Sequence, residues 1–186
     1  MADDFATVDP VFGLKHRFWR TAGETGREVQ HVETWVEPGG GVTPHIHPAM
    51  EERFTVHDGR CEFLSGRDWI EAGPGEEVVV PACTRHAFRN RGGVPTRIEC
   101  EATPPSTLQA FLEDAAGLSR AGKITKFGLP KPNGLLEAAV LVTRYSDMVT
   151  LLAPAPPPAL QKLIFPPLAR VAERRGKKAG TFAKLT

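Results

Sequence analysis

The sequence predicts a mainly β fold, a closed barrel or sandwich of short strands, that is followed by a helical segment. Short runs of alternating apolar and polar residues precede Pro104-Pro105, and such runs are typical of half-buried strands. Clusters of glycine and proline separate these runs, which indicates many short strands joined by tight turns. After Pro104-Pro105 the apolar residues recur with helical spacing instead. We therefore expect a β-barrel over residues 1–105 and a helical extension over residues 106–186.

The predicted strands follow from alternation, which is clear at 28–36, 53–56, 78–80 and 97–100. Asp58-Gly59 lies between two apolar runs and predicts a hairpin turn. In the run 28–36, one face carries His31, Glu33 and Trp35, and the other carries Val32, Thr34 and Val36. The alternation leaves open which of these two faces points into the barrel.

The predicted helices begin after Pro105. Ser106 and Gln109 have the spacing of a capping box, and the apolar residues that follow have helical spacing. A second helix is expected over about 135–152 and a third over 160–175, with a break at Pro166-Pro167. The basic end, residues 174–186, is expected to be mobile. It lacks the interleaved aromatic residues with which proteins stack on nucleic-acid bases.

Composition limits the classes of partner. The 186 residues are 41% hydrophobic and 24% charged, with a net charge of +1, so no overall field favours nucleic acid or a membrane. The acidic first residues do not resemble a secretion signal, and no apolar run is long enough to span a membrane. Three cysteines without C-x-x-C spacing are expected to be reduced thiols. We therefore expect a cytoplasmic protein that binds neither nucleic acid nor membrane.

Three of the six histidines fall in a pattern that suits a metal ion. His45 and His47 are two positions apart, so on a strand they point to the same face, about 6–7 Å apart. Glu52 lies at an odd offset from His47, and Pro48 offers a point at which the phase could be reset. His86 would come from a distant strand. Neutral imidazoles and one carboxylate suit iron, manganese, nickel, copper or zinc. Glu51 is an alternative to Glu52 at this stage.

Two motifs resemble those of the cupin superfamily. The first is Gly39-x5-His45-x-His47-x4-Glu52-x6-Gly59, which is similar to the first cupin motif at every position. The second is Gly75-x5-Pro81-x-Cys83-x2-His86-x3-Asn90, which is similar to the second cupin motif except that the family has glycine where this chain has Cys83. The resemblance covers about residues 28–103 and is closest to small single-domain bacterial cupins.

The resemblance implies a double-stranded β-helix, or jelly-roll barrel, that holds one divalent transition metal near one mouth. It implies that His45, His47, Glu52 and His86 are the ligands, and that Glu52 rather than Glu51 is the carboxylate, because Glu52 keeps the motif's distance to Gly59. Cys83 puts the local turn in question, because glycine supplies a backbone angle that cysteine resists. Because cupins commonly dimerise, we also expect a homodimer.

Four further residues are candidates for the pocket wall: Phe54, Phe88, Asn90 and Cys83. Phe88 is the best candidate because it shares a strand face with His86 and Asn90. Cys83 could be a reactive thiol, although a small structural residue is the favoured interpretation.

The sequence does not assign catalytic residues, so the function it supports is broad. The first hypothesis is a metal-dependent enzyme of the oxygenase or isomerase type that acts on an unidentified small molecule. The alternative is a non-catalytic module that binds or senses a small ligand. Fold alone does not choose between them, because this scaffold supports many chemistries.

Overall fold

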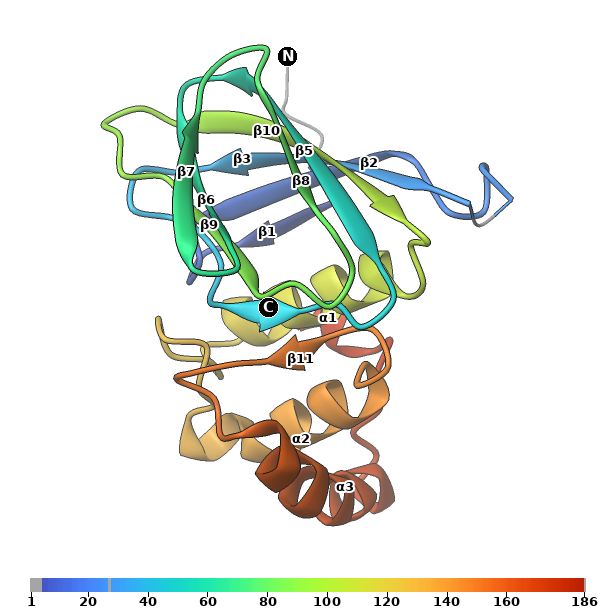
Figure 1. Cartoon of the computed structure of the whole chain (residues 1–186). Coiled ribbons are helices and arrows are strands. Elements are labelled where there is room, and N and C mark those ends of the chain that lie inside the picture. Colours follow the sequence, from blue (N-terminus) through green and yellow to red (C-terminus); the bar gives the residue numbers. More distant parts are fainter. Residues whose placement is uncertain (1–4, 27, 186) are drawn as a thin grey trace.

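A computed structural model describes residues 5–26 and 28–185. Two antiparallel sheets face each other and enclose the barrel interior (Figure 1). In spatial order, the six-stranded sheet contains β1 (Thr7–Asp9), β2 (Leu14–Arg20), β3 (Gln30–Val36), β10 (Thr96–Thr103), β5 (Glu51–Asp58) and β8 (Glu77–Val80). The five-stranded sheet contains β11 (Thr150–Leu151), β4 (His45–Ile46), β9 (His86–Arg89), β6 (Cys61–Ser65) and β7 (Asp68–Ala72). This confirms the predicted double-stranded β-helix.

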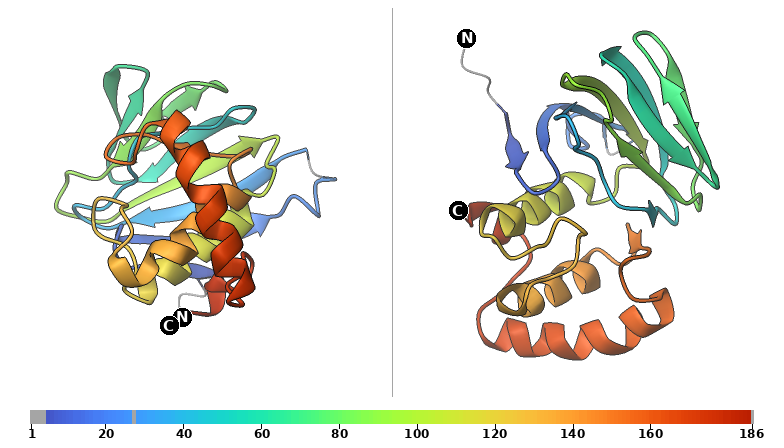
Figure 2. Two further views of the ribbon diagram at one scale, coloured as in Figure 1. Left: turned by 90° about the horizontal axis from the view of Figure 1, so that it is seen from below. Right: turned by 90° about the vertical axis from the view of Figure 1, so that its left-hand side faces the viewer.

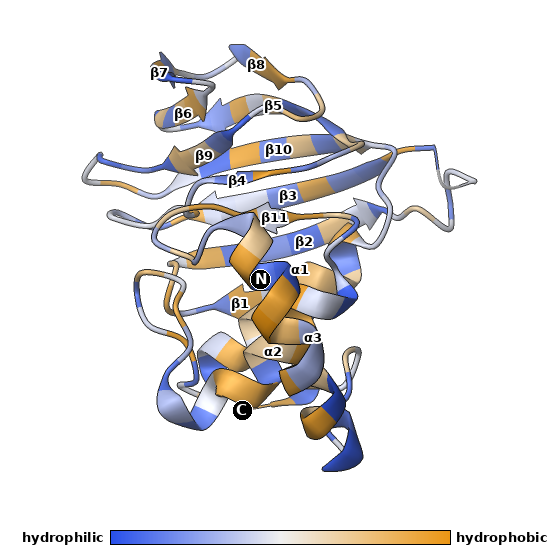
Figure 3. Ribbon diagram, turned by 60° about the horizontal axis from the view of Figure 1, so that its bottom comes forward, coloured by the Kyte–Doolittle hydropathy of each residue, from blue (hydrophilic) through white to orange (hydrophobic). Residues whose placement is uncertain are grey.

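Alternation along the strands separates the barrel interior from its outer surface. Hydrophobic and hydrophilic residues alternate along β10 in Figure 3, as expected for a strand with one buried face. On β3, Val32 and Val36 belong to the hydrophobic core, whereas His31 is on the opposite face and pairs with Glu99. The question that the sequence left open is therefore decided: the face with Val32, Thr34 and Val36 points inward.

Asp58 and Gly59 do not form the predicted hairpin. They connect β5 to β6, and these two strands belong to different sheets. Gly59 has a φ of +77°, and a Cβ atom there would lie 2.8 Å from the Thr96 hydroxyl oxygen. Glycine is thus required for a turn that carries the chain across the barrel, from one sheet to the other.

The C-terminal part contains α1 (Leu108–Arg120), α2 (Leu135–Arg144) and α3 (Pro158–Arg174), with short 3-10 turns η1 (Pro132–Gly134) and η2 (Phe182–Lys184). These helices lie beneath one end of the barrel (Figures 1 and 2). No helix in the described part of the chain is both long and apolar enough to cross a bilayer. The three predicted helices are present, but their details differ from the expectations.

The second helix is shorter than expected because part of its sequence is used by the barrel. It ends at Arg144, and Thr150–Leu151 then pairs with β4 as strand β11. The third helix continues through Pro166-Pro167, where a break was expected. The capping box does not form, since Thr107 is the N-cap and makes no side-chain cap hydrogen bond. The Gln109 amide instead donates to Glu113.

Residues 176–185 pack against α1, where the sequence led us to expect a mobile end. Phe182 is only 3% exposed, and its carbonyl lies against Gly117, where a Cβ atom would be 1.8 Å from that oxygen. The carboxylate of Asp114, on α1, accepts hydrogen bonds from the backbone N–H groups of Phe182 (3.0 Å) and Ala183 (3.1 Å). The prediction of a mobile end was therefore wrong. It rested on the basic charge of the segment, whereas the buried ring of Phe182 and the buried carboxylate of Asp114 hold the segment in place.

Candidate metal centre

Three strands bring the four predicted ligands together. His45 lies on β4 directly opposite His86 on β9, and His47 follows β4 immediately. Glu52 lies on β5, which belongs to the other sheet. The odd offset between His47 and Glu52 is explained by the irregular segment 47–50 between β4 and β5, which interrupts the alternation of a continuous strand. Glu51 is exposed and Glu52 is only 5% exposed, which decides the choice between the two carboxylates.

The donor atoms of this group lie within 4.8 Å of one another. Nε2 of His86 is 2.9 Å from Oε2 of Glu52, and Nε2 of His47 is 3.6 Å from Oε1 of the same carboxylate. The rings of His45 and His86 have their centroids 4.1 Å apart. Three imidazoles and one carboxylate thus meet at one point inside the barrel.

Hydrogen bonds fix the orientation of each imidazole. The Nδ1–H group donates to a backbone carbonyl in all three: His45 to Thr43 (2.8 Å), His47 to Met148 (2.7 Å) and His86 to Thr84 (2.9 Å). A histidine that donates from Nδ1 keeps its lone pair on Nε2. The three Nε2 atoms are therefore available to a metal, as in metal sites whose outer hydrogen bonds orient the ligands.

Two polar atoms at the centre lack the partners that buried groups need. In the described residues, Oε2 of Glu52 and Nε2 of His86 are fully buried and make no hydrogen bond. They lie close together but are not aligned to bond each other. Leaving a buried polar atom without a partner costs about 1–3 kcal/mol. A divalent cation would satisfy both atoms, so the residues present fit a metal ion.

The local electrostatics favour the ligand forms of His45 and Glu52, whereas the effect of burial on the pKa of His86 is outweighed by the Glu52 carboxylate, which raises that pKa. Burial lowers the pKa of His45 to about 3, and the neighbouring His86 and His47 act in the same direction. Burial would raise the pKa of Glu52, but the three surrounding histidines outweigh it and lower that pKa to about 2. A neutral His45 and an ionised Glu52 are the forms that coordinate metals.

Cys100 is a contact that the sequence reasoning missed. Its Sγ lies 3.6 Å from Oε1 of Glu52 and donates to it. Burial raises the pKa of Cys100 well above its ordinary range, so the group remains a thiol. Finding this contact requires the register between β10 and β5, in which Cys100 lies opposite Phe54, two residues from Glu52 on the same face of β5.

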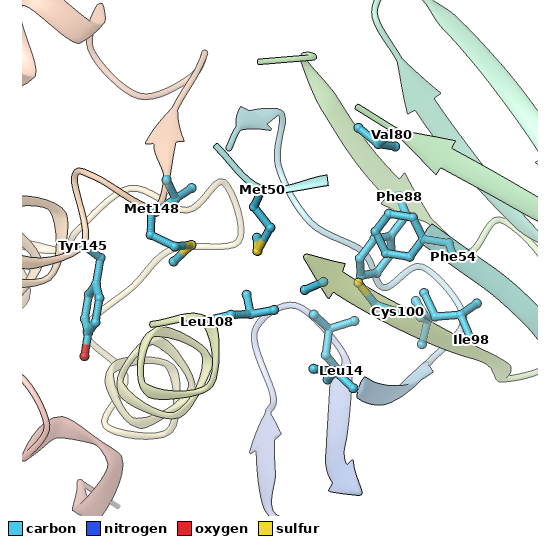
Figure 4. Packing of buried hydrophobic residues seen from close by; sticks show 14 of the residues in the cluster. Leu14, Met50, Phe54, Val80, Phe88, Ile98, Cys100, Leu108, Tyr145 and Met148 are labelled. Carbon is cyan, nitrogen blue, oxygen red and sulfur yellow. The ribbon is translucent and has the colours of Figure 1, made fainter. Parts of the chain in front are cut away.

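A cavity of about 170 Å³ extends from the four ligands. Its wall is mainly apolar and is built from both parts of the chain: Leu14, Val32, Phe54 and Phe88 from the barrel, and Leu108, Phe111, Leu112 and Leu141 from the helices. Figure 4 shows Phe54, Phe88 and Cys100 on the barrel side, with Met50 and Met148 where the barrel meets the C-terminal part. The helical extension thus closes the cavity.

Two of the four predicted wall residues line this cavity, Phe54 and Phe88, and two do not. The expectation for Asn90 is corrected because its amide donates to the carbonyls of Val36 (2.9 Å) and Val94 (2.8 Å), which fixes a loop. Cys83 is exposed, and its Sγ lies 3.1 Å from the carbonyl oxygen of Pro48. Neither side chain is free to face a ligand.

Cys83 has a φ of +62°, in the left-handed region that disfavours residues with a Cβ atom. We expect Cys83→Gly to raise the free energy of unfolding by about 0.5–1 kcal/mol, because relief of backbone strain exceeds the added entropy of the unfolded chain. Chemical denaturation measures this change. Cys83→Ala is the matched control because it removes the thiol and keeps the strain. An equal gain in both variants would contradict the backbone explanation.

A fourth histidine on the cavity wall, His16 on β2, was also missed by the sequence reasoning. It is 4% exposed, and its Nδ1 is 2.9 Å from the hydroxyl oxygen of Thr34. Burial lowers the pKa of His16 to about 4. The imidazole is therefore neutral at neutral pH. Only the pairing of β2 with β3 identifies this position as inward-facing.

The low pKa of His16 predicts a loss of stability in acid. The unfolded chain, with a histidine pKa near 6.5, takes up this proton at a higher pH than the folded protein does. The stability that neutral His16 contributes is complete above the unfolded-state pKa of 6.5, and it is lost as the pH falls toward 4. We expect metal-free His16→Leu protein to lose about 2 kcal/mol less stability than the parent between about pH 7.5 and about pH 5. Urea unfolding at both pH values measures the difference; equal losses would contradict the assignment.

A further group of potential ligands lies on the outer face of the barrel, made of His31, Glu99 and Glu101. Two of its members are already paired: Nδ1 of His31 is 2.7 Å from Glu99, and Nε2 of His57 is 2.9 Å from the other oxygen of that carboxylate. Both oxygens of Glu99 therefore have partners, unlike Oε2 of Glu52 inside the barrel.

Comparison with known proteins agrees with this fold. Residues 32–100 match the family model described as "Cupin domain". A tetracenomycin polyketide synthase protein of Streptomyces glaucescens is 27% identical over 84 residues, which are 45% of this chain and 55% of that protein. An uncharacterized protein of Methanocaldococcus jannaschii is 30% identical over 74 residues, 40% of this chain and 59% of that protein. The chain thus spans less than two thirds of either curated relative.

Among solved structures, that of a predicted oxalate decarboxylase from Thermotoga maritima is similar with a TM-score of 0.50 and 12% identity. The similarity covers 55% of this chain and 96% of that one. At this identity the likeness concerns the fold alone.

Proposed function

We propose, since residues 32–100 match the cupin domain model, that the protein is a metal-dependent enzyme that converts a small molecule held in the cavity. One observation carries the proposal: three oriented imidazoles and a carboxylate lie at the wall of a largely apolar cavity. A purely structural site would have no need of a cavity beside it. A ligand in this cavity would lie next to the ion, with its remaining surface away from water.

The chain's own residues support catalysis in two ways. His45, His47, Glu52 and His86 would hold the ion, and their hydrogen bonds to backbone carbonyls would keep them oriented during turnover. The apolar wall would exclude water and strengthen electrostatic interactions inside the cavity. A bound divalent transition metal would supply a Lewis acid and, if it is iron, manganese or copper, a redox centre. Chemistry of the oxygenase or isomerase type is compatible with this arrangement.

The curated relatives give limited support. The name of one of them places it with a polyketide synthase, which favours a small organic molecule as the substrate. The match covers only part of that protein, so its activity is not transferred to this chain.

The test measures two quantities: the metal content of the protein and its conversion of small molecules. Protein purified without a chelating column is analysed for bound metals, and is then incubated with an organic-solvent extract of the source cells, with and without air. Glu52→Gln protein, which keeps the shape of the ligand and loses its charge, is treated in the same way. Mass spectrometry compares the small molecules before and after incubation.

A compound that gains oxygen only in air, and only with the parent, supports an oxygenase. A new isomer of unchanged mass, formed with and without air, supports an isomerase. A compound that is retained and unchanged overturns the catalytic proposal and favours the alternative, a module that binds or senses a small ligand. Absence of metal after reconstitution with each candidate ion overturns the proposal altogether.

A further inference from the structure

The cavity has a second polar feature, away from the four metal ligands. His16 lies on the wall, is almost fully buried, and uses Nδ1 in its hydrogen bond with Thr34. In the described part of the chain this is the only hydrogen bond of the ring, so Nε2 is the nitrogen left for a ligand. Nε2 is not among the fully buried unpaired atoms of the described residues, so it keeps accessible surface on the cavity wall. A ligand in the cavity can therefore reach Nε2 and form a hydrogen bond with it.

Strand register places His16 and the metal ligands at different depths in the barrel. Glu52 lies opposite Ala102, which lies opposite Gln30. His16 lies opposite Thr34. Gln30 and Thr34 are four residues apart on β3, which corresponds to about 13 Å along the strand direction. The two polar features are therefore separated along the barrel, and the same cavity joins them.

The wall between these features is apolar and rich in aromatic rings. It includes Phe12, Leu14, Val32, Phe54, Phe88 and Phe111. Asp9 also reaches the wall, but its Oδ1 accepts hydrogen bonds from the Ser119 hydroxyl and from two backbone N–H groups. These bonds fix the Asp9 carboxylate through Oδ1, whereas His16 Nε2 receives no hydrogen bond from the described residues. Aromatic walls favour ligands with rings, because rings pack well against rings.

We propose that the ligand is an elongated, mainly apolar ring molecule with an oxygen-bearing group at each end, and that His16 binds the end remote from the metal centre. This inference rests on the proposed function for the first end, where an oxygen would meet the ion. His16 then selects among ligands, because a molecule without the second polar group would leave Nε2 unpaired.

The test compares four aromatic acids that share a carboxylate for the metal end. The probes are 6-hydroxy-2-naphthoic acid, 2-naphthoic acid, 4-hydroxybenzoic acid and benzoic acid, and binding to zinc-loaded full-length protein is measured by calorimetry. Zinc gives no redox turnover of the probes. In the parent, the hydroxyl group should improve the affinity of the naphthoic acid about fivefold, as one added hydrogen bond would. The hydroxyl group should improve the affinity of benzoic acid less, because the single ring is too short to reach both the metal centre and His16.

The variant His16→Leu should bind both naphthoic acids equally, so the fivefold preference disappears. Thr34→Val should reduce the preference, because it removes the hydroxyl that orients the ring. His57→Leu, on the outer face, is the control and should keep the preference. Equal binding of 2-naphthoic acid by the parent and the His16 variant shows that the variant is folded.

A preference that persists in His16→Leu protein, or is absent in the parent, would overturn the role of His16. If neither naphthoic acid binds the parent, the proposed ligand class is wrong. These outcomes are independent of catalysis, since they concern ratios of affinity. A protein that proves to lack turnover could still show the preference, so failure of the proposed function and failure of this inference are distinguishable.

Discussion

Replacing His45 and His86 together by alanine is expected to abolish binding of the divalent ion and the thermal stabilisation that the ion gives. The two residues lie opposite each other on β4 and β9 and supply half of the four ligands. A ligand that binds only the folded state stabilises it by about 2.7 kcal/mol at a hundred times its dissociation constant. For a chain of this size, this corresponds to a melting temperature higher by roughly 5–10 °C. Elemental analysis and thermal unfolding with and without added metal measure both effects.

The matched control is the pair His31→Ala and His57→Ala, which also removes two histidines. Both lie on the outer face of the barrel, around Glu99. This control should retain one metal per chain and the full thermal shift. If the control loses the metal and the variant of the inner pair keeps it, the ion binds the outer group and the site described above is not the metal centre.

Replacing Asp114 by alanine is expected to destabilise the C-terminal part by about 3–5 kcal/mol. This carboxylate is 0% exposed and accepts the hydroxyl of Tyr145 (2.9 Å) and the backbone N–H groups of Gly180, Phe182 and Ala183. Alanine would leave all four donors without this acceptor, and those of Tyr145 and Phe182 are buried. Thermal unfolding should show a melting temperature lower by roughly 6–20 °C.

The neighbouring Glu113 provides the control, because it lies on the same turn of α1 and is only partly buried. Glu113→Ala should change stability by less than about 1 kcal/mol. Limited proteolysis adds a local measurement: cleavage near residues 176–185 should accelerate in the Asp114 variant alone. Unchanged proteolysis together with unchanged stability would show that the C-terminal segment is held by other contacts.

Much of the candidate site follows from the sequence, because its spacing is local. His45 and His47 are two positions apart, and the distance from Glu52 to Gly59 identifies the carboxylate once the motif is seen. The barrel itself follows from alternation and from the glycine and proline clusters between strands. These features depend on a few neighbouring residues, and sequence reasoning handles such features well.

The parts that were not predicted depend on contacts between distant segments. The carbonyl of Met148 orients His47 from 101 positions away. His16 and Cys100 become site residues only when β2 pairs with β3 and β10 pairs with β5. The segment 145–152 has a helical pattern, yet pairing with β4 determines its conformation. Tertiary contacts here override local preference, and no periodicity reveals them.

The hydrogen bond from His47 to Met148 makes coordination of an ion and docking of the C-terminal part mutually dependent equilibria. Ion binding favours docking by the same factor by which docking favours ion binding, since coupling free energies are reciprocal. Evolution can therefore adjust the affinity for the ion through substitutions in α2 or α3, far from the four ligands. The helices would then serve as a place where affinity is tuned while the ligands themselves stay constant.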